Sequence, residues 1–220
     1  MKKVVLVIIA AVIVLFGVFA IYYLSQNKDE NKTNNENFET SENIENAENS
    51  NDINNDTLNE NKKYLVVYYS AQNHTRNIAK KIAENLNADI FEIVPKAEYT
   101  SEDLNWNNEN SRVSKEHANE SLRNVELKAT KVNNWESYDT VIIAYPIWWS
   151  IAAWPVNTFV KANDFSNKTV IPVCTSASSG IGQSGKLLEK EVNSGKWLEG
   201  HRFSSNATDA EITKWTDSLK

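Results

Sequence analysis

Cysteine is almost absent from this chain of 220 residues, which contains only Cys174. A single cysteine excludes an intrachain disulfide, so the stability of the fold has to come from buried apolar surface. Histidine is nearly as scarce, because the chain has three, far apart in the sequence. Together with Cys174 they show no spacing typical of a metal site, and we predict none. Cys174 has no partner for redox chemistry and is interpreted as a small buried hydrophobe.

Two other patterns are missing, and each absence excludes a class of function. Basic residues are not clustered, so nucleic acid is not an expected partner. The Gly-x-Ser-x-Gly motif of many hydrolases does not occur. A Gly-x-Gly-x-x-Gly pattern does run from Gly180 to Gly185, but it begins several residues after Cys174, and Glu199 is not at the end of the next strand. A dinucleotide fingerprint is therefore not expected.

Charge is absent from residues 4–24, a run of 21 residues. As a helix this run would span roughly 30 Å, the thickness of a bilayer core. Lys2 and Lys3 precede it, which favours a cytoplasmic N-terminus and export of the rest. A cleaved signal peptide is the alternative, because Val18 to Ala20 offers small residues for cleavage. We predict that residues 1–24 form a single-pass anchor in the cell membrane, with the remaining chain on the extracytoplasmic side.

Residues 25–61 have few large apolar side chains. They contain 13 Asn and 10 acidic residues against two Lys. Such a segment cannot bury enough surface to offset its ordering entropy, so a disordered tether is predicted. Residues 62–220 hold 19 basic and 19 acidic residues, so the net charge of −6 belongs to the N-terminal part. These 159 residues are enough for one folded domain.

Apolar runs and helical patterns alternate along residues 62–220. Because the runs are apolar on both faces, they indicate parallel strands covered by helices on both sides. The sequence therefore predicts an α/β fold with a doubly wound, five-stranded parallel sheet. Residues 95–134 fit worst, and one helix with a long surface loop is expected there. The expected strands are 65–69, 90–94, 141–145, 170–174 and a weaker one in 197–203; the expected helices are 75–86, part of 111–122, 154–162, 183–192 and 209–219.

The end of the first predicted strand has the composition of an anion-binding turn. Hydroxyl, amide and imidazole side chains stand there, directly before a helical pattern. Backbone N–H groups of residues 71–76 and the helix dipole would favour a phosphate. An ordinary capped helix start is the alternative. The candidate ligands are Ser70, Gln72, Asn73, His74 and Thr75.

Two further strand ends complete a candidate site, because ligands of open α/β sheets bind at the carboxyl ends of strands. Residues 146–149 read Pro-Ile-Trp-Trp, and one of the two Trp could cover a flat ligand while the other packs inward. The alternative is that both Trp are structural. Residues 175–182 carry four hydroxyl residues and two Gly, which could approach the edge of a planar heteroaromatic ring.

These segments resemble the flavodoxin family, most closely its short, exported or anaerobe-type branch, over about residues 63–219. The strongest match is residues 144–149, Ala-Tyr-Pro-Ile-Trp-Trp, supported by residues 155–156, 158–159, 164–166, 168–176 and 179–182. The resemblance implies a sheet of order 2-1-3-4-5 that binds FMN without a covalent link. It assigns the phosphate to the turn at Ser70, Gln72, Asn73, His74 and Thr75, one ring face to Tyr145, Pro146, Ile147, Trp148 and Trp149, and the other ring edge to Thr175, Ser176, Ala177, Ser178, Ser179 and Gly180.

The chain departs from the family in two places. Gln72, Asn73 and His74 replace the hydroxyl, Gly and Asn of the usual phosphate turn, and Asn tolerates the left-handed conformation such a turn needs. Residues 176–182 lack the Tyr that many flavodoxins stack on the outer flavin face, so that face is expected to be open. The implied function is electron transfer or flavin-dependent reduction, with a redox protein or a small quinone-like substrate as partner. A flavin-free extracytoplasmic binding module is the alternative.

Overall fold

The computed structural model describes residues 62–220. The anchor predicted for residues 1–24 and the tether predicted for residues 25–61 lie outside this range and stay predictions. Within residues 62–220, no helix has both the length and the apolar composition that a membrane span requires.

The described residues form one sheet in which all strands but β4 are parallel. Its order is β2-β1-β3-β5, and β6 and β7 follow one another along the outer edge of β5. The short β4 pairs antiparallel with β3. The bounds are β1 (Tyr64–Tyr68), β2 (Asp89–Glu92), β3 (Thr140–Trp148), β4 (Ile151–Ala152), β5 (Thr169–Ser176), β6 (Lys196–Trp197) and β7 (His201–Ser204).

The predicted parallel α/β class is confirmed, and the predicted strand order is corrected in two respects. The fifth position is occupied by two short strands, β6 and β7, instead of one. The break between them lies opposite Pro172 of β5, which has no N–H to donate to a ladder. Gly200 packs against Pro172 at this break, where an added Cβ would lie 2.5 Å from the proline carbonyl oxygen. The second correction is β4, which the sequence did not indicate.

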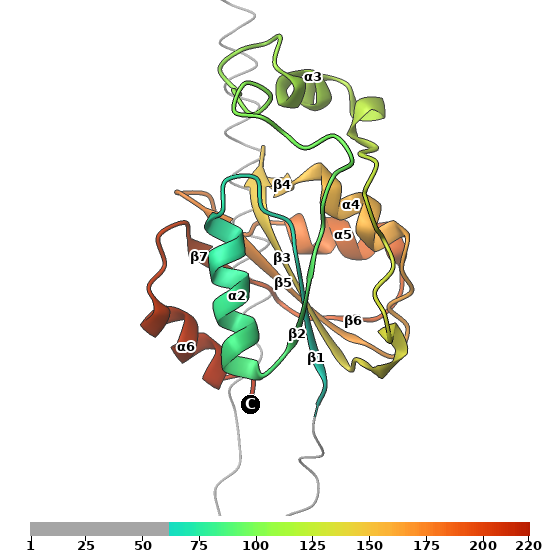
Figure 1. The fold of residues 1–220 in the computed structure, drawn as a ribbon, viewed down its shortest axis with the longest axis vertical. Coiled ribbons are helices and arrows are strands. Elements are labelled where there is room, and N and C mark those ends of the chain that lie inside the picture. Colours follow the sequence, from blue (N-terminus) through green and yellow to red (C-terminus); the bar gives the residue numbers. More distant parts are fainter. Residues whose placement is uncertain (1–61) are drawn as a thin grey trace, which may run out of the picture. The chain divides into compact units, whose positions relative to one another are not determined.

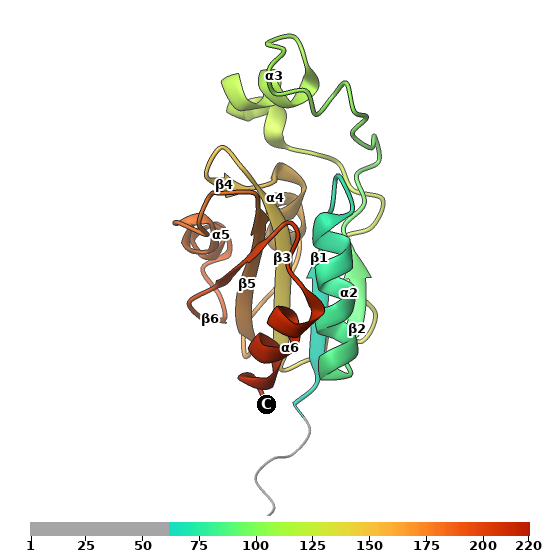
Figure 2. The same ribbon diagram turned by 90° about the vertical axis from the view of Figure 1, so that its left-hand side faces the viewer.

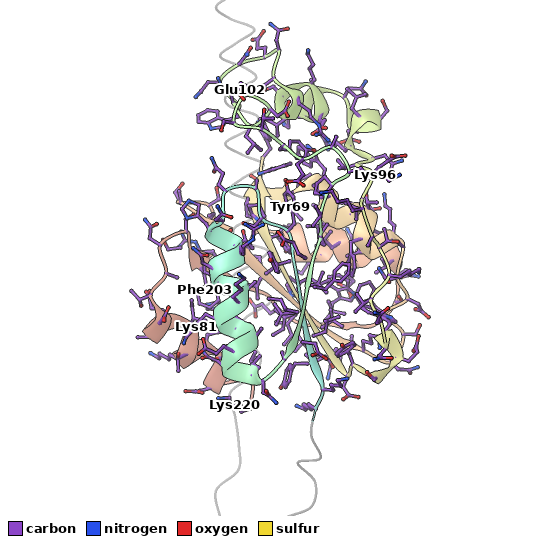
Figure 3. The ribbon with its side chains drawn as sticks, viewed as in Figure 1. Tyr69, Lys81, Lys96, Glu102, Phe203 and Lys220 are labelled. Atoms are coloured by element: carbon purple, nitrogen blue, oxygen red, sulfur yellow. The ribbon has the colours of Figure 1, made fainter. Side chains whose placement is uncertain are left out.

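Helices cover both faces of the sheet, as Figures 1 and 2 show. Side chains alternate along β1, so Leu65 and Val67 face one core and Val66 and Tyr68 the other. The first core is completed by α4 (Trp154–Lys161) and α5 (Ser184–Val192), and the second by α2 (His74–Leu86) and α6 (Asp209–Asp217). Figure 3 labels Phe203 on the side of α2 and α6.

Local signals place the helix ends close to their predicted positions. Thr208 caps α6 in a capping box, accepting a hydrogen bond from the N–H of Glu211. Pro155 occupies the first turn of α4, where a missing N–H costs nothing. At the end of α2, Asn87 adopts the left-handed conformation (φ 48°) that closes many helices.

Residues 97–125 form a separate excursion between β2 and β3, here called the lobe. It contains α3 (Arg112–Ala118) and the 3-10 helix η1 (Glu120–Arg123), so the prediction of one helix and a long loop is confirmed with a shorter helix. Backbone bonds close its base, from Lys96 N to Glu126 O and from Lys128 N to Val94 O, each 2.8 Å long. Figure 1 shows the lobe beyond the carboxyl ends of the strands, and Figure 3 labels Glu102 on it.

A polar cluster holds the lobe together. The carboxylate of Glu116, only 5% exposed, accepts hydrogen bonds from the Tyr99 hydroxyl (2.7 Å) and from Arg112 Nε (2.8 Å). The Arg112 guanidinium also lies over the Tyr99 ring, 3.8 Å from its centroid, and donates to the carbonyl of Ala97. Burial, followed by the bond to Glu116, raises the pKa of Tyr99 above its ordinary value, so this hydroxyl stays a donor.

Candidate functional site

A cavity of about 680 Å³ opens where β1, β3 and β5 end. Its wall combines the three predicted strand-end segments with the loop after β7 and with the lobe. The lining residues are Ser70, Ala71, Gln72, His74, Thr75, Leu104, Trp106, Val113, Pro146, Ile147, Trp148, Trp149, Thr175, Ser176, Ala177, Ser205 and Asn206.

The turn after β1 presents a row of free donors. Within residues 62–220, none of the backbone N–H groups of residues 71–76 donates to a protein acceptor. The turn is possible because Asn73, which caps α2, takes a left-handed conformation with φ 67°. Ser70 adds a buried hydroxyl whose Oγ finds no partner in the described part of the chain. Buried polar groups are normally paired, so this arrangement is typical of a site that accepts an anion.

Thr75 and Thr175 join the first and third segments. Thr75 is 1% exposed, and its Oγ1 lies 2.8 Å from Oγ1 of Thr175 at the end of β5. One hydroxyl donates to the other, so the proton of the accepting hydroxyl remains available to a ligand. Both residues line the cavity.

The other side chains of the turn are fixed by neighbours. His74 Nδ1 lies 3.0 Å from the carbonyl oxygen of Ser205. Because a carbonyl oxygen can only accept, Nδ1 is the donor of this hydrogen bond. The other ring nitrogen, Nε2, makes no hydrogen bond within residues 62–220. The Asn73 side chain accepts from Arg76, which also pairs with Glu92. The hydrogen bond that Arg76 donates to the Glu92 carboxylate raises the pKa of Arg76. Asn73 supports the turn but does not line the cavity, unlike the other four predicted phosphate ligands.

The Trp pair belongs to a hairpin, which corrects the predicted strand-to-helix loop. β3 continues through Pro146 and Ile147 to Trp148 and pairs with β4, and Trp149 and Ser150 form the turn. Both turn residues have positive φ, 45° and 68°. A two-residue hairpin turn of this kind favours Asn-Gly, so a Trp there is strained.

The two Trp side chains have different surroundings. Trp148 is half-buried and packs edge-on against Tyr69, Tyr99 and Trp154, with ring centroids 5.7, 5.2 and 5.4 Å away. Trp149 is 38% exposed, and the imidazole of His117 stacks on it at 4.3 Å. Trp148 is thus packed more tightly than Trp149, both rings line the cavity, and the contact of either ring with a ligand stays a prediction.

The third segment is only partly in the cavity. Ser176 and Ala177 line it and are held by Arg202, which donates to the carbonyls of both (3.0 and 3.1 Å) and to Ser176 Oγ (3.1 Å). The predicted ligands Ser178, Ser179 and Gly180 are exposed and do not line the cavity. Gly182 and Gly185 do not line it either.

Tyr145 is the other predicted residue outside the cavity wall. It is 0% exposed, and its hydroxyl lies 3.0 Å from Ser184 Oγ in the core beneath α5. Burial raises the pKa of Tyr145 well above its ordinary value. Its position follows from strand alternation, because Tyr145 and Pro146 point to opposite faces of β3.

Sequence reasoning missed the lobe residues and the loop after β7. Leu104, Trp106 and Val113 bring the lobe into the cavity wall, and Ser205 and Asn206 close another side. Trp106 is 69% exposed, and a lone Trp in an Asn-rich loop was the one sequence signal for a role there. Nothing in the sequence indicated that the loop folds back over the strand ends.

The sequence profile of the flavodoxin family matches residues 63–219. The chain belongs to the flavodoxin family. No curated protein matches the sequence. Among solved structures, a protein provisionally assigned as a flavoprotein from Bacteroides eggerthii is 38% identical (TM-score 0.65), with 72% of this chain and 98% of that chain covered. A second such protein, from Bacteroides uniformis, is 35% identical (TM-score 0.65), with 70% and 97% covered.

A more distant structure is a flavoprotein from Lactobacillus acidophilus in complex with FMN. It is 20% identical, with a TM-score of 0.54, and the match covers 71% of this chain and 99% of that chain. At 20% identity, this match shows that the two proteins share a fold. The predicted family and the predicted parallel α/β class of fold are thus confirmed.

Proposed function

We propose that this chain is a membrane-tethered flavodoxin that binds FMN without a covalent link and acts in electron transfer or flavin-dependent reduction. Membership of the flavodoxin family and the FMN in the Lactobacillus acidophilus flavoprotein support FMN as the cofactor. The observation in this chain that carries the proposal is the donor-rich turn at residues 70–76.

The turn fits a phosphate group. The N–H groups of residues 71–76 and the Ser70 hydroxyl, none of which has a partner within residues 62–220, lie where α2 begins. Each charge-assisted hydrogen bond to the dianion would contribute about 1.5 to 3 kcal/mol. Thr75 supplies a further hydroxyl through its pair with Thr175. The turn therefore favours FMN over riboflavin, which lacks the phosphate.

The rest of the cavity fits a planar ring system. Its volume of about 680 Å³ lies in the range of small-molecule sites. Trp148 and Trp149 offer apolar surface on one side, and the backbone of Ser176 and Ala177, held by Arg202, offers hydrogen bonds at an edge. Trp106 of the lobe lines the same cavity and would lie near the ring, while the predicted openness of the outer flavin face stays a prediction.

The cofactor and the protein would have different roles in this site. Bound FMN supplies the capacity to accept and donate electrons, which no side chain of the site offers. The turn at residues 70–76 would hold the phosphate, the Thr75 and Thr175 pair ties this turn to β5, and Leu104, Trp106 and Val113 of the lobe complete the wall.

The predicted location and partners remain part of the proposal. An anchor at residues 1–24 and a tether at residues 25–61 would hold the domain on the extracytoplasmic side of the cell membrane. The domain has equal numbers of acidic and basic residues, so we expect no strong electrostatic steering of its partner. A redox protein or a small quinone-like substrate is the partner.

Purification tests the proposal. The full-length chain, kept in detergent because residues 4–24 are apolar, should copurify with a yellow flavin that mass spectrometry identifies as FMN. A colourless protein that also rejects added FMN would contradict the proposal and support a flavin-free binding module instead.

A further inference from the structure

Arg202, on β7, is attached to the wall of the cavity of about 680 Å³, here called the flavin cavity. Its guanidinium donates to the carbonyl oxygens of Ser176 (3.0 Å) and Ala177 (3.1 Å), and its Nε donates to Ser176 Oγ (3.1 Å). Ser176 and Ala177 line the flavin cavity, whereas Arg202 does not. The positive charge is therefore held directly behind this part of the wall.

Arg202 has no carboxylate as a counter-ion in the described part of the chain. Residues 62–220 contain four arginines, and the other three, Arg76, Arg112 and Arg123, each form an ion pair with a glutamate. Arg202 forms none within this range. Its hydrogen bonds go to neutral oxygens, and a guanidinium keeps its charge at physiological pH. Because the side chain is partly buried, water and salt screen this charge only in part.

The charge of Arg202 acts on the end of β5. Arg202 lies opposite Cys174 of β5 in the sheet. Burial raises the pKa of the Cys174 thiol to about 12, and the positive charge of Arg202 opposes this rise. A cation that favours a thiolate also favours other negative charges near the same strand end. The guanidinium therefore makes this side of the flavin cavity favourable for negative charge.

The cavity wall does not oppose this effect. Within residues 62–220, the lining residues include no Asp and no Glu. The carbonyl and the N–H of a trans peptide point in opposite directions, so the bond from Arg202 to the Ser176 carbonyl turns the Ala177 N–H away from the guanidinium. This N–H has no acceptor within the same residues. A free donor and an unpaired positive charge thus lie on one side of the cavity.

We propose that Arg202 raises the reduction potential of bound FMN, because its unpaired charge stabilises the negative charge that reduction adds to the ring. Two electrons from the redox protein proposed above and one proton from water leave one negative charge on the ring. Charge near the ring is one of the means by which a protein tunes a flavin. This role rests on the proposed function and on the ring edge lying at Ser176 and Ala177. Arg202 would act from behind the wall, without touching the cofactor.

The affinities of oxidised and reduced FMN for the full-length chain in detergent test this role. Their ratio sets the difference in reduction potential between bound and free FMN. Fluorescence titration gives the affinity of oxidised FMN, and spectroelectrochemical titration of the FMN-loaded chain at neutral pH gives the potential. A purely structural role of Arg202 would change both affinities equally, so it would not move the potential.

Three variants separate the charge of Arg202 from its hydrogen bonds. Arg202→Gln removes the charge and should weaken the binding of reduced FMN about tenfold more than that of oxidised FMN, which lowers the two-electron potential by about 30 mV. Arg202→Lys keeps the charge without the planar fork and should keep the potential close to that of the parent. Lys214→Gln removes a charge from α6, whose residues do not line the cavity, and is the control that should leave the potential unchanged.

A further variant keeps the test decisive should Arg202→Gln fail to fold. Ser204→Asp retains Arg202 and places a carboxylate two residues away on the same face of β7, so it should also lower the potential. An unchanged potential in Arg202→Gln or in Ser204→Asp, or a fall in Arg202→Lys as large as that in Arg202→Gln, would overturn the role of Arg202. A parent chain that binds no FMN would instead contradict the proposed function, and this role with it.

Discussion

The strand-end segments and the lobe build opposite sides of one cavity by different means. The strand ends are positioned by a core in which every second side chain of β1, β3 and β5 is buried on the same face. The lobe has few large buried apolar side chains, and its order depends on one ion pair and its neighbours around Glu116. A mutation in the core should therefore destabilise the whole domain, whereas a mutation in the lobe should cause only local unfolding of the lobe.

The largest expected effect lies in the core. Phe159 of α4 is 0% exposed and packs against Phe91 and Trp135. Phe159→Ala should lower the free energy of unfolding by about 3 to 5 kcal/mol, because it leaves a cavity. Denaturant unfolding measures this loss. Leu122→Ala, at a site 50% exposed, is the control and should stay within about 0.5 kcal/mol of the parent.

Loss of the lobe cluster should have a smaller and local effect. Glu116→Ala leaves the Tyr99 hydroxyl and Arg112 without their carboxylate, at a local cost of about 3 kcal/mol. Hydrogen exchange should show lost amide protection in residues 97–125 and unchanged protection in β1 and β3. Glu120→Ala, whose side chain is 85% exposed, should change little. Global unfolding in Glu116→Ala would show that lobe and core are one cooperative unit.

Trp106 tests whether the lobe takes part in cofactor binding. Because this side chain is 69% exposed, Trp106→Ala should leave stability unchanged. Lost stacking should weaken FMN binding about three- to tenfold, measured by fluorescence titration. Leu122→Ala is again the control. An unchanged FMN affinity would mean that the strand ends hold the cofactor without the lobe.

The smallest effect concerns the cap of α6. The backbone N–H of Thr208 donates to the carboxylate of Glu211, and the Thr208 hydroxyl does so as well. These bonds, the backbone one first, hold the pKa of Glu211 below its ordinary value. The stabilisation is therefore present above the unfolded pKa and is lost as pH falls through the folded pKa. The protection of the Thr208 amide, measured as its exchange rate relative to the intrinsic rate at the same pH, should fall in that acid range, and less so in Glu211→Gln.

The sequence predicted the parts of the fold whose causes are local. Apolar runs of about five residues identified β1, β3 and β5, and the helical pattern over residues 209–219 identified α6. The turn after β1 was readable because Asn73 can take a positive φ where the family uses Gly. These features need no knowledge of distant residues.

The remaining features depend on tertiary packing. The extension of β3 through Pro146 to Trp148 requires β4 as its partner, and the split of the fifth strand depends on Pro172 of a neighbouring strand. Tyr145 was assigned to the cofactor, but the alternation of β3 turns it toward Ser184. The lobe could not be placed because its contacts join residues that no sequence period relates.

The preference for FMN over riboflavin tests the phosphate turn most directly. Calorimetric titration of the flavin-free full-length chain should show FMN binding at least about tenfold more tightly than riboflavin. Ser70→Ala removes a hydroxyl that has no protein partner in the described residues, so it should weaken FMN binding without weakening riboflavin binding or stability. Equal affinities of FMN and riboflavin for the parent chain would contradict the assignment of the phosphate to residues 70–76.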